Sequence, residues 1–579
     1  MQNYQLPVAL LLASSAFISD ALAAGPSGID YSMYFNADVR DAEYCQLTYS
    51  KKRYDYGQDV TNPAMTCPDA FSWQLFTEVV HDRFWSNWAQ ETQNWPVQPY
   101  PLCTADQSPA TASCCMPGSN DNDKDHCPVF PGDKYSKLLK LLDGANDSKA
   151  ATLLSSNPEL ILKGRPSILE HGKNLKRVVH DTKSQQCSAA QIASLIPENY
   201  ESKGRIMRQT NNEITVRNRP FHYYLFRNDL YNANGVLEVF KDNAANQLAN
   251  APFHQSNESA KRNADAGKQQ LTTIDLPPAA IMIKSNWIYQ GLAEQLGMLG
   301  DNNQYITKTL TTPVCVAKDK NDETCDQTKH PENYCDLTGP HYLLAFHISS
   351  KDVPQWVWTT FEHVDNPGRC DFTGCNDAFG YKSPETAPGK NAADNYLKPR
   401  QHSDQLSSPS TVYNRDTVYP KEQIRPELAT LFKARGIATG LSTSRVEPDP
   451  EDKAWLNYRL KGSQVNFVDH TGRSTLLGNS ITEAGFMQQS SCISCHSRAG
   501  VHLQASVRDG KATESAEFLR LSVFERQLSD FGYQQSVHNT PKPEWFYNND
   551  DQSTLDVLQT DFIWGFLFAR PLCTDGNCK

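Results

Sequence analysis

Two cysteines and a histidine lie close together near the C-terminal end of the chain, in the run Cys492-Ile493-Ser494-Cys495-His496. Cysteines at positions i and i+3 of a helical turn project from one side of it, so both thiols can reach one edge of a planar ligand. A haem carries its two vinyl groups on one such edge, and each vinyl group can take up a thiol to form a thioether. The histidine that follows offers an imidazole nitrogen to the iron. The run therefore predicts one covalently attached haem c, with Cys492 and Cys495 as the attachment sites and His496 as the proximal iron ligand.

Two other interpretations of the same run remain open at this point. A Cys-x-x-Cys pair is also the active sequence of thioredoxin-like redox domains, although it then normally follows a strand–helix unit near the start of a small domain. The two cysteines could also form a plain structural disulfide.

The sixth iron ligand is harder to predict. Small cytochromes c take a methionine well downstream of the haem motif, but the last methionine here is Met487, which precedes it. A second histidine is the obvious substitute, and His347 and His363, in two aromatic-rich segments, are the candidate distal ligands. His502 is very close to the motif in sequence, and His538 lies in a polar stretch. An open sixth position is the alternative.

The N-terminus is typical of a secretory signal. Residues 6–18 are apolar and uncharged, and Ala21-Leu22-Ala23 supplies the small residues that a signal peptidase needs, although the leader has no Lys or Arg. We expect residues 1–23 to be removed. No other segment approaches the ~20 apolar residues of a membrane span, so we expect none after cleavage.

Cysteine content and charge agree with export. The chain has 16 cysteines, and those outside the haem motif are even in number. In an oxidising compartment, periplasmic or extracellular, they are expected to form disulfides that hold long loops, with Cys370–Cys375 and Cys573–Cys578 as local pairs. A net charge of −11 without a long basic run argues against a nucleic-acid partner and favours a basic redox partner protein.

The elements that must position these residues follow from periodicity. Apolar residues recur at helical spacing from Asp69 towards residue 94, which predicts one long helix with Asp69 as its N-cap. Residues 99–133 are rich in Cys, Pro, Asp and Asn and are expected to form a disulfide-held loop. Residues 279–288 predict a buried strand, and residues 341–350 and 353–364 a hairpin. Alternation along its first strand places His341 and His347 on the face of Leu343 and Ala345.

The C-terminal part has its own predicted elements. Residues 455–460 and 464–468 suit strands, and residues 515–531 suit a helix. Ser480 and Glu483 form a capping-box pattern that would start a helix leading to the haem motif. Because residues 374–413 are polar and turn-rich, a domain junction is expected nearby. We therefore expect an α+β protein: residues 24–450 form a large, β-rich part with helices, and residues 451–579 a mainly helical, cytochrome c-like haem unit.

Three segments resemble a family of large exported monohaem proteins described only as cytochrome c family proteins. These are residues 71–76 (FSWQLF), residues 347–366 with the block WVWTTFEHVDN, and residues 477–483 running into the Cys-x-x-Cys-His run. The resemblance extends over most of the mature chain but not over the Cys-rich loops at 103–127 and 315–335. It implies a haem c in the C-terminal part and a large preceding domain, and it implies no substrate.

Function is thus expected to be electron transfer by an exported cytochrome, either as a carrier or as the redox subunit of an oxidoreductase. Carrying an electron takes only about 100 residues, and far more than that precede the motif. A haem enzyme with an open distal site, peroxidase- or oxygenase-like, and a non-enzymatic ligand-binding haem module therefore remain as alternatives. Whether the chain is an enzyme is left open, and no catalytic residue is assigned.

Overall fold

The computed structural model describes most of residues 44–573. The segments left out are 167–184, 199–202, 250–260, 263–268, 299–303, 319–323, 371–374, 383–418, 469–471, 484–489, 516–540 and 547–554, together with a few shorter stretches. The predicted signal peptide, residues 1–23, lies outside the described residues, as do His538, Cys578 and most of the polar segment 374–413.

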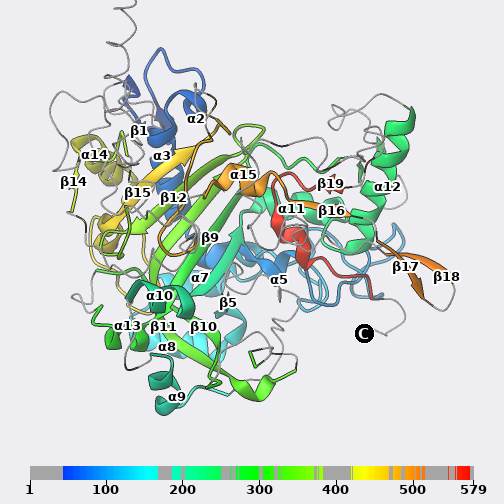
Figure 1. Ribbon diagram of the computed structural model, residues 1–579, viewed down its shortest axis with the longest axis horizontal. Helices are drawn as coiled ribbons and strands as arrows, with labels where there is room; N and C mark the ends of the chain where they lie inside the picture. The colour runs from blue at the N-terminus through cyan, green and yellow to red at the C-terminus, as the bar shows by residue number, and fades with distance from the viewer. Residues whose placement is uncertain are drawn as a thin grey trace, which may run out of the picture.

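A mixed sheet organises the fold (Figure 1). Within the described residues it has nine strands, and six of them lie side by side in the order β15, β12, β11, β9, β6 and β3. The other three are added to this row: β10 pairs with the N-terminal half of β11, β4 pairs with β10, and β5 pairs with β6. The strands are β3 (Ala89–Gln90), β4 (Leu162–Lys163), β5 (Arg165–Pro166), β6 (Asn212–Arg217), β9 (Ile281–Tyr289), β10 (Thr307–Cys315), β11 (Tyr334–Ser350), β12 (Val357–His363) and β15 (Tyr458–Gln464).

Helices surround this sheet, and none of those described is long and apolar enough to cross a membrane. They are α2 (Pro63–Thr66), α3 (Pro68–His81), α4 (Phe84–Asn87), α5 (Glu91–Asn94), α6 (Pro131–Lys134), α7 (Ser136–Asp143), α8 (Asp147–Ser156), α9 (Ala189–Ser194), α10 (Lys203–Thr210), α11 (Arg219–Arg227), α12 (Ala233–Ala249), α13 (Gln290–Gln295), α14 (Pro426–Arg435) and α15 (Cys492–His496). Two-stranded ribbons complete the described fold: β1–β2 (Thr48–Ser50, Arg53–Asp55), β7–β8 (Lys261–Arg262, Gln269–Gln270), β13–β14 (Tyr381–Lys382, Gln423–Ile424), β16–β19 (Gly500–His502, Val557–Gln559) and β17–β18 (Gln504–Arg508, Lys511–Ser515).

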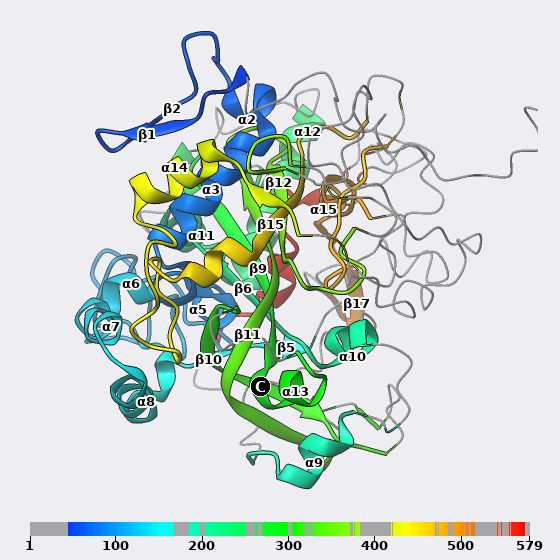
Figure 2. The same cartoon turned by 90° about the vertical axis from the view of Figure 1, so that its left-hand side faces the viewer.

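The two faces of the sheet have different environments. Figure 2 shows α3 and α14 on one side of the strands and α15 on the other. On the α3 side, Trp73 and Phe76 pack on Phe361 of β12 with ring centroids 5.1 Å and 4.9 Å apart. Aromatic contacts of this kind contribute about 0.5–1.5 kcal/mol each beyond the area that they bury. The main aromatic core therefore lies on the face opposite to the Cys-x-x-Cys-His run.

The long helix predicted from Asp69 to residue 94 is correct only in its first half. α3 begins at Pro68, and its N-cap is Cys67, which a disulfide joins to Cys45. Asp69 is instead a buried helical residue. The helix ends after the exposed His81, because Arg83 adopts a left-handed φ of 55°. This reversal turns the chain back, so that the residues that continue the apolar stripe form the short helix α4 and strand β3.

The predicted buried strand and hairpin are confirmed. β9 covers residues 281–289, and β11 pairs antiparallel with both β9 and β12. The predicted shared face of His341 and His347 is wrong, because a β-bulge between Leu343 and Ala345 shifts the alternation. Leu343 faces the aromatic core under α3, whereas Ala345 packs in a separate cluster on the other face. His347 consequently points away from the core that Leu343 enters.

Disulfides hold the long connections, as predicted from the cysteine count. The described residues contain six: Cys45–Cys67, Cys103–Cys114, Cys115–Cys127, Cys187–Cys335, Cys315–Cys325 and Cys370–Cys375. Two of them close the loop predicted at residues 99–133, and the local pair Cys370–Cys375 is confirmed. Cys573 is also disulfide-bonded. Disulfides in this number are typical of an oxidising environment.

The mainly helical C-terminal unit is not confirmed. Of the strand expected at residues 455–460, residues 455–457 belong to a 3-10 helix (Lys453–Asn457) and residues 458–460 to β15, which pairs with β12 inside the central sheet. The residues that follow the predicted domain boundary, between 450 and 451, therefore still contribute a strand to the central sheet. Beyond β15, the described residues contain strands β16–β19 and only short helices, including a 3-10 helix at Trp564–Phe568. Of the helix predicted at 515–531, Ser515 ends β18 and the rest lies outside the described residues.

A buried carboxylate pair beneath α3 makes stability depend on pH. Asp377 accepts hydrogen bonds from Trp73 Nε1 and the Gly380 amide, and Asp69 accepts them from the Ala378 amide and Ser463 Oγ. Burial, together with the charge of Asp69, raises the pKa of Asp377 to about 7. The folded protein therefore holds a proton that the unfolded chain releases near pH 4, so stability is greatest below that pH and falls as the pH rises towards 7.

Asp377→Asn is expected to flatten this dependence. The amide keeps one acceptor oxygen and cannot ionise, so the loss of unfolding free energy between pH 4 and pH 7, about 3 kcal/mol, should largely disappear. Urea unfolding at intervals across this range measures it. Asp59→Asn, at an exposed position, is the control and should leave the slope unchanged. Equal slopes in the wild type and the Asp377→Asn variant would contradict the assignment.

Candidate functional site

The Cys-x-x-Cys-His run forms a short helix, α15, that β15 holds in place. The amide of Ile493 donates to Gln464 Oε1 at 2.9 Å, and Gln464 Nε2 donates to Ser491 Oγ at 3.0 Å. The Ile493 side chain is fully buried. Ser491, the residue before the helix, is extended, with φ −146° and ψ 107°. One strand-end glutamine therefore fixes both the start and the register of the helical turn.

The two cysteines of α15 are thiols and are not joined to each other. All other cysteines in the described part of the chain are in disulfides, so this pair differs from them although the surroundings favour oxidation. This finding argues against the structural-disulfide interpretation of the run. Burial, with the charge of Glu483, raises the pKa of Cys492 well above its ordinary value, so this thiol is protonated at neutral pH. The reactive cysteine of a thioredoxin-type domain has instead a lowered pKa, so that its thiolate forms near neutral pH.

His496 is oriented as a metal-binding imidazole. Its Nδ1 lies 2.8 Å from the carbonyl oxygen of Phe562, so Nδ1–H donates there and the Nε2 lone pair remains for a ligand. The indole ring of Trp358 packs beside the imidazole, with ring centroids 4.3 Å apart. Burial lowers the pKa of His496 to about 4, which keeps the ring neutral. A neutral histidine with one nitrogen hydrogen-bonded to a carbonyl is the usual form of a metal ligand.

The carbonyl that orients His496 is presented by an unusual turn. Asp561 and Phe562 both have left-handed φ values, 47° and 67°. The Asp561 carboxylate holds the turn by accepting hydrogen bonds from Lys351 Nζ at 2.5 Å and from Trp356 Nε1 at 3.2 Å. Non-glycine residues in this conformation cluster at functional sites, because surrounding contacts must sustain the strain. Nothing in the sequence signals that residue 562 would supply this carbonyl.

A pocket opens between α15 and the sheet. It encloses about 120 Å³, and both cysteines and His496 line it. Its floor is the sheet face opposite to α3, where Arg217 of β6, Met282 of β9, Ser349 of β11 and Trp358 of β12 lie in one row of the register. Trp564, Gly565, Leu567 and Phe568 form another wall.

His347, a predicted distal ligand, lines the same pocket as His496. Its Nε2 lies 3.1 Å from Glu483 Oε1 and 3.1 Å from Asn479 Nδ2, while Nδ1 is buried and has no hydrogen-bond partner. Burial alone would raise the pKa of Glu483, but the contact with His347 and the charge of Lys284 outweigh it, so the pKa lies below its usual range. The anionic Glu483 accepts from Nε2–H, which leaves the Nδ1 lone pair of His347 without a protein partner.

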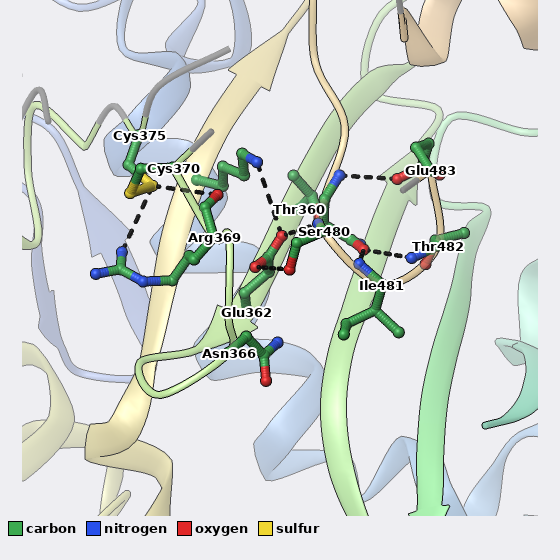
Figure 3. A network of polar contacts seen from close by, with 12 residues as sticks. Thr360, Glu362, Asn366, Arg369, Cys370, Cys375, Ser480, Ile481, Thr482 and Glu483 are labelled. Carbon is green, nitrogen blue, oxygen red and sulfur yellow. Dashed lines mark hydrogen bonds and ion pairs between the residues drawn. A yellow bond between two sulfur atoms is a disulfide. The ribbon is translucent and has the colours of Figure 1, made fainter. Parts of the chain in front are cut away.

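The turn that carries Glu483 is bonded to β12, as Figure 3 shows. Asn479 Nδ2 donates to Thr360 Oγ1, while the amide and hydroxyl of Ser480 both donate to Glu362. The predicted capping box is therefore displaced by one residue. Asn479 Oδ1, not Ser480, accepts the amides of Ile481 and Thr482, and Glu483 accepts the Asn479 amide. Ser480 cannot cap because Glu362 takes its hydroxyl. The residues that follow, 484–489, lie outside the described part of the chain.

The second predicted distal ligand, His363, is not brought to the pocket. Its Nε2 donates to the carbonyl of Gln304 at 2.9 Å, its Nδ1 accepts the Asp365 amide, and its ring stacks on Tyr305. With both nitrogens occupied, it is a structural histidine. His502 lies on β16, and its side chain is not among those that the structure describes.

The described residues contain no group of three or more His, Cys, Asp or Glu side chains that could hold a metal ion. A metal centre built from protein ligands alone, such as a zinc site, is thus not found in that part of the chain. One histidine offering one nitrogen suits an ion whose other ligands come from a cofactor.

Of the residues singled out in the sequence, the three of the motif and His347 line one pocket, whereas most of its other lining residues were not predicted. Lys284, Arg217 and Trp564 line the pocket, yet single charged or aromatic residues in strands and loops carry no signal of this. Comparison with models of protein families, with curated proteins and with solved structures finds no match to this chain.

Proposed function

We propose that this chain is an exported c-type cytochrome, of the monohaem family that it resembles, which carries one haem on Cys492 and Cys495 and acts in electron transfer. The observation that supports this most directly is the combination on one helical turn of two thiols and a neutral imidazole, all three lining one pocket. The bound haem would supply one-electron chemistry at its iron.

The chain's own residues have separate tasks in this proposal. Cys492 and Cys495 would hold the haem through thioethers, each formed by addition of an S–H bond across one vinyl group, which needs no oxidant. The Phe562 carbonyl fixes the His496 ring through Nδ1, so that Nε2 would be free to bind the iron. Trp358 packs beside this imidazole and helps to exclude water from it. The net charge of −11 suits a basic redox partner, and the disulfides suit the periplasm or the cell exterior.

The mass and the spectrum of the exported protein test the proposal. Produced in a host that attaches haem c, it should carry the mass of one haem on the proteolytic fragment that contains Cys492 and Cys495. Its denatured, reduced pyridine complex should give the absorption of a thioether-linked haem. A fragment of unmodified mass would contradict the proposal.

His347 is the residue we propose as the sixth ligand. Its unpartnered Nδ1 and its hydrogen bond to Glu483 match the environment of a metal-ligating histidine. His347→Ala is expected to convert a low-spin ferric spectrum to a high-spin one that binds cyanide at once. His363→Gln, at a buried histidine outside the pocket, is the matched control and should stay low-spin. An unchanged spectrum in His347→Ala would remove it as a ligand.

A haem enzyme is the second candidate, because the same geometry gives it support. A histidine that is held by a buried carboxylate and faces a pocket is also an acid–base group. In that case the wild-type ferric protein should already be high-spin and should react with added peroxide. A wild-type spectrum indifferent to cyanide and carbon monoxide would exclude this candidate.

A further inference from the structure

A network of buried charges lies beside the pocket. Arg165 donates to both oxygens of Glu91 at 3.0 Å and lies 2.8 Å from Glu213, which in turn pairs with Lys284 at 3.0 Å. These two cations and two carboxylates balance one another. Because a buried ion needs a partner of opposite charge, a further cation nearby has to share one of these carboxylates.

Arg217 is such a further cation. Its side chain is 1% exposed, and its Nε and Nη1 have no hydrogen-bond partner. The guanidinium lies over the ring of Trp95, 4.5 Å from its centre. Burial lowers the pKa of Arg217 to about 10 although the charge of Glu91 acts against this, so it is still charged at neutral pH. Glu91 already accepts two hydrogen bonds from Arg165. Leaving two donors of a buried cation without acceptors is costly, and this cost indicates that a ligand supplies an acceptor.

A second unpartnered donor lies on the adjoining wall. The indole Nε1 of Trp564 lines the pocket side of the 3-10 helix and is buried without an acceptor. The neighbouring Gly565 brings this wall against Arg217, because a Cβ at that position would lie 2.6 Å from the guanidinium Nη2. Two buried donor groups without acceptors, one of them charged, therefore belong to residues that line the same pocket.

The position of these donors suits one particular anion. Arg217 on β6 and Trp358 on β12 stand in the same row of the sheet, three strand spacings apart, or about 14 Å. Trp358 packs on His496. A haem carries its two propionates on the edge opposite to its two vinyl groups. A haem fixed by its vinyl groups to α15 therefore directs its carboxylates away from the cysteines, and the donors lie at the far end of the pocket.

We propose that Arg217 and Trp564 form a carboxylate-binding site, and that its occupant is a propionate of the haem, an assignment that rests on the proposed function. Guanidinium and indole N–H groups are suitable donors for a carboxylate, and a propionate would accept the hydrogen bonds that Arg217 does not make within the protein.

The test uses the haem-loaded full chain with Arg217→Gln, and with Arg217→Lys as the variant that keeps the charge. Removing the guanidinium leaves a propionate charge uncompensated, which disfavours the reduced iron. Arg217→Gln should therefore retain the attached haem and shift the reduction equilibrium about tenfold towards the oxidised form, or about 59 mV for one electron. Its propionate bending band in the resonance Raman spectrum should move, and Arg217→Lys should restore most of the potential. Arg219→Gln, at an exposed position nearby, should change neither quantity.

Each result has a distinct meaning. A wild-type protein without attached haem would contradict the proposed function itself. Attached haem with the potential and propionate band of the wild type in Arg217→Gln would overturn this inference alone. Added succinate distinguishes a free carboxylate from a propionate. If succinate stabilises the loaded wild type saturably but not Arg217→Gln, and the propionate band is the same in both, the propionate assignment is overturned.

Discussion

Replacing Cys492 and Cys495 together with alanine is expected to abolish covalent haem attachment completely. Each thioether needs one of these sulfurs, and within the described residues no other cysteine is available, because the rest are in disulfides. The exported double variant should have the mass of the polypeptide alone. Each single variant should retain at most one thioether and should be obtained in low yield.

The control for this experiment removes two cysteines elsewhere. Cys370→Ala with Cys375→Ala deletes a disulfide that lies outside the pocket and should leave the haem content per folded molecule unchanged. His496→Gly gives an independent check, because the thioethers can still form while the iron loses its proximal ligand. Added imidazole should then restore the spectrum. Haem mass that persists in the Cys492 and Cys495 double variant would contradict the attachment sites.

The second large effect is expected from the disulfide between Cys187 and Cys335. Its cysteines are 148 positions apart, and it joins the segment before α9 to β11, the strand that carries His347. In the chain-entropy treatment, a cross-link across a loop of this length restricts the unfolded chain by about 5 kcal/mol. Replacing both cysteines with serine should therefore lower the free energy of unfolding by up to that amount.

A second disulfide nearby serves as the control that distinguishes the effect of loop length from the effect of replacing two cysteines with serine. Cys315–Cys325 is also attached to the β10–β11 region, but its cysteines are only 10 positions apart, and the same treatment gives about 3 kcal/mol. The denaturation midpoints of the two double-serine variants measure the difference. If the short-loop variant lost as much stability as the long-loop one, native-state packing rather than loop length would determine the effect.

Local patterns were sufficient to predict the backbone form of the Cys-x-x-Cys-His run. The spacing of the two thiols and the imidazole depends on one helical turn, and α15 has that form. The paired strands β11 and β12 follow from alternation and composition, and they are also found. What these features share is that each depends on residues close together in the chain.

The features that could not be predicted depend on single backbone irregularities or on distant pairing. The bulge beyond Leu343 reverses the side on which His347 emerges, and the left-handed Arg83 ends α3 early. The pairing of β12 with β15 joins segments on either side of a long polar stretch, which the sequence suggested as a junction. Arg217 has no local signal either, since a charged residue in a strand is normally at the surface.

The row of residues on the sheet floor connects the Cys-x-x-Cys-His run with segments far away in the chain. The pocket takes its floor from β6, β9, β11 and β12, and its other walls from the C-terminal segments together with Glu91 and Arg165. Those same strands bury the aromatic core on their other face. The two faces of β12 are therefore mechanically coupled: a substitution of Phe361 that moves this strand also moves Trp358, and with it the side of the pocket next to His496.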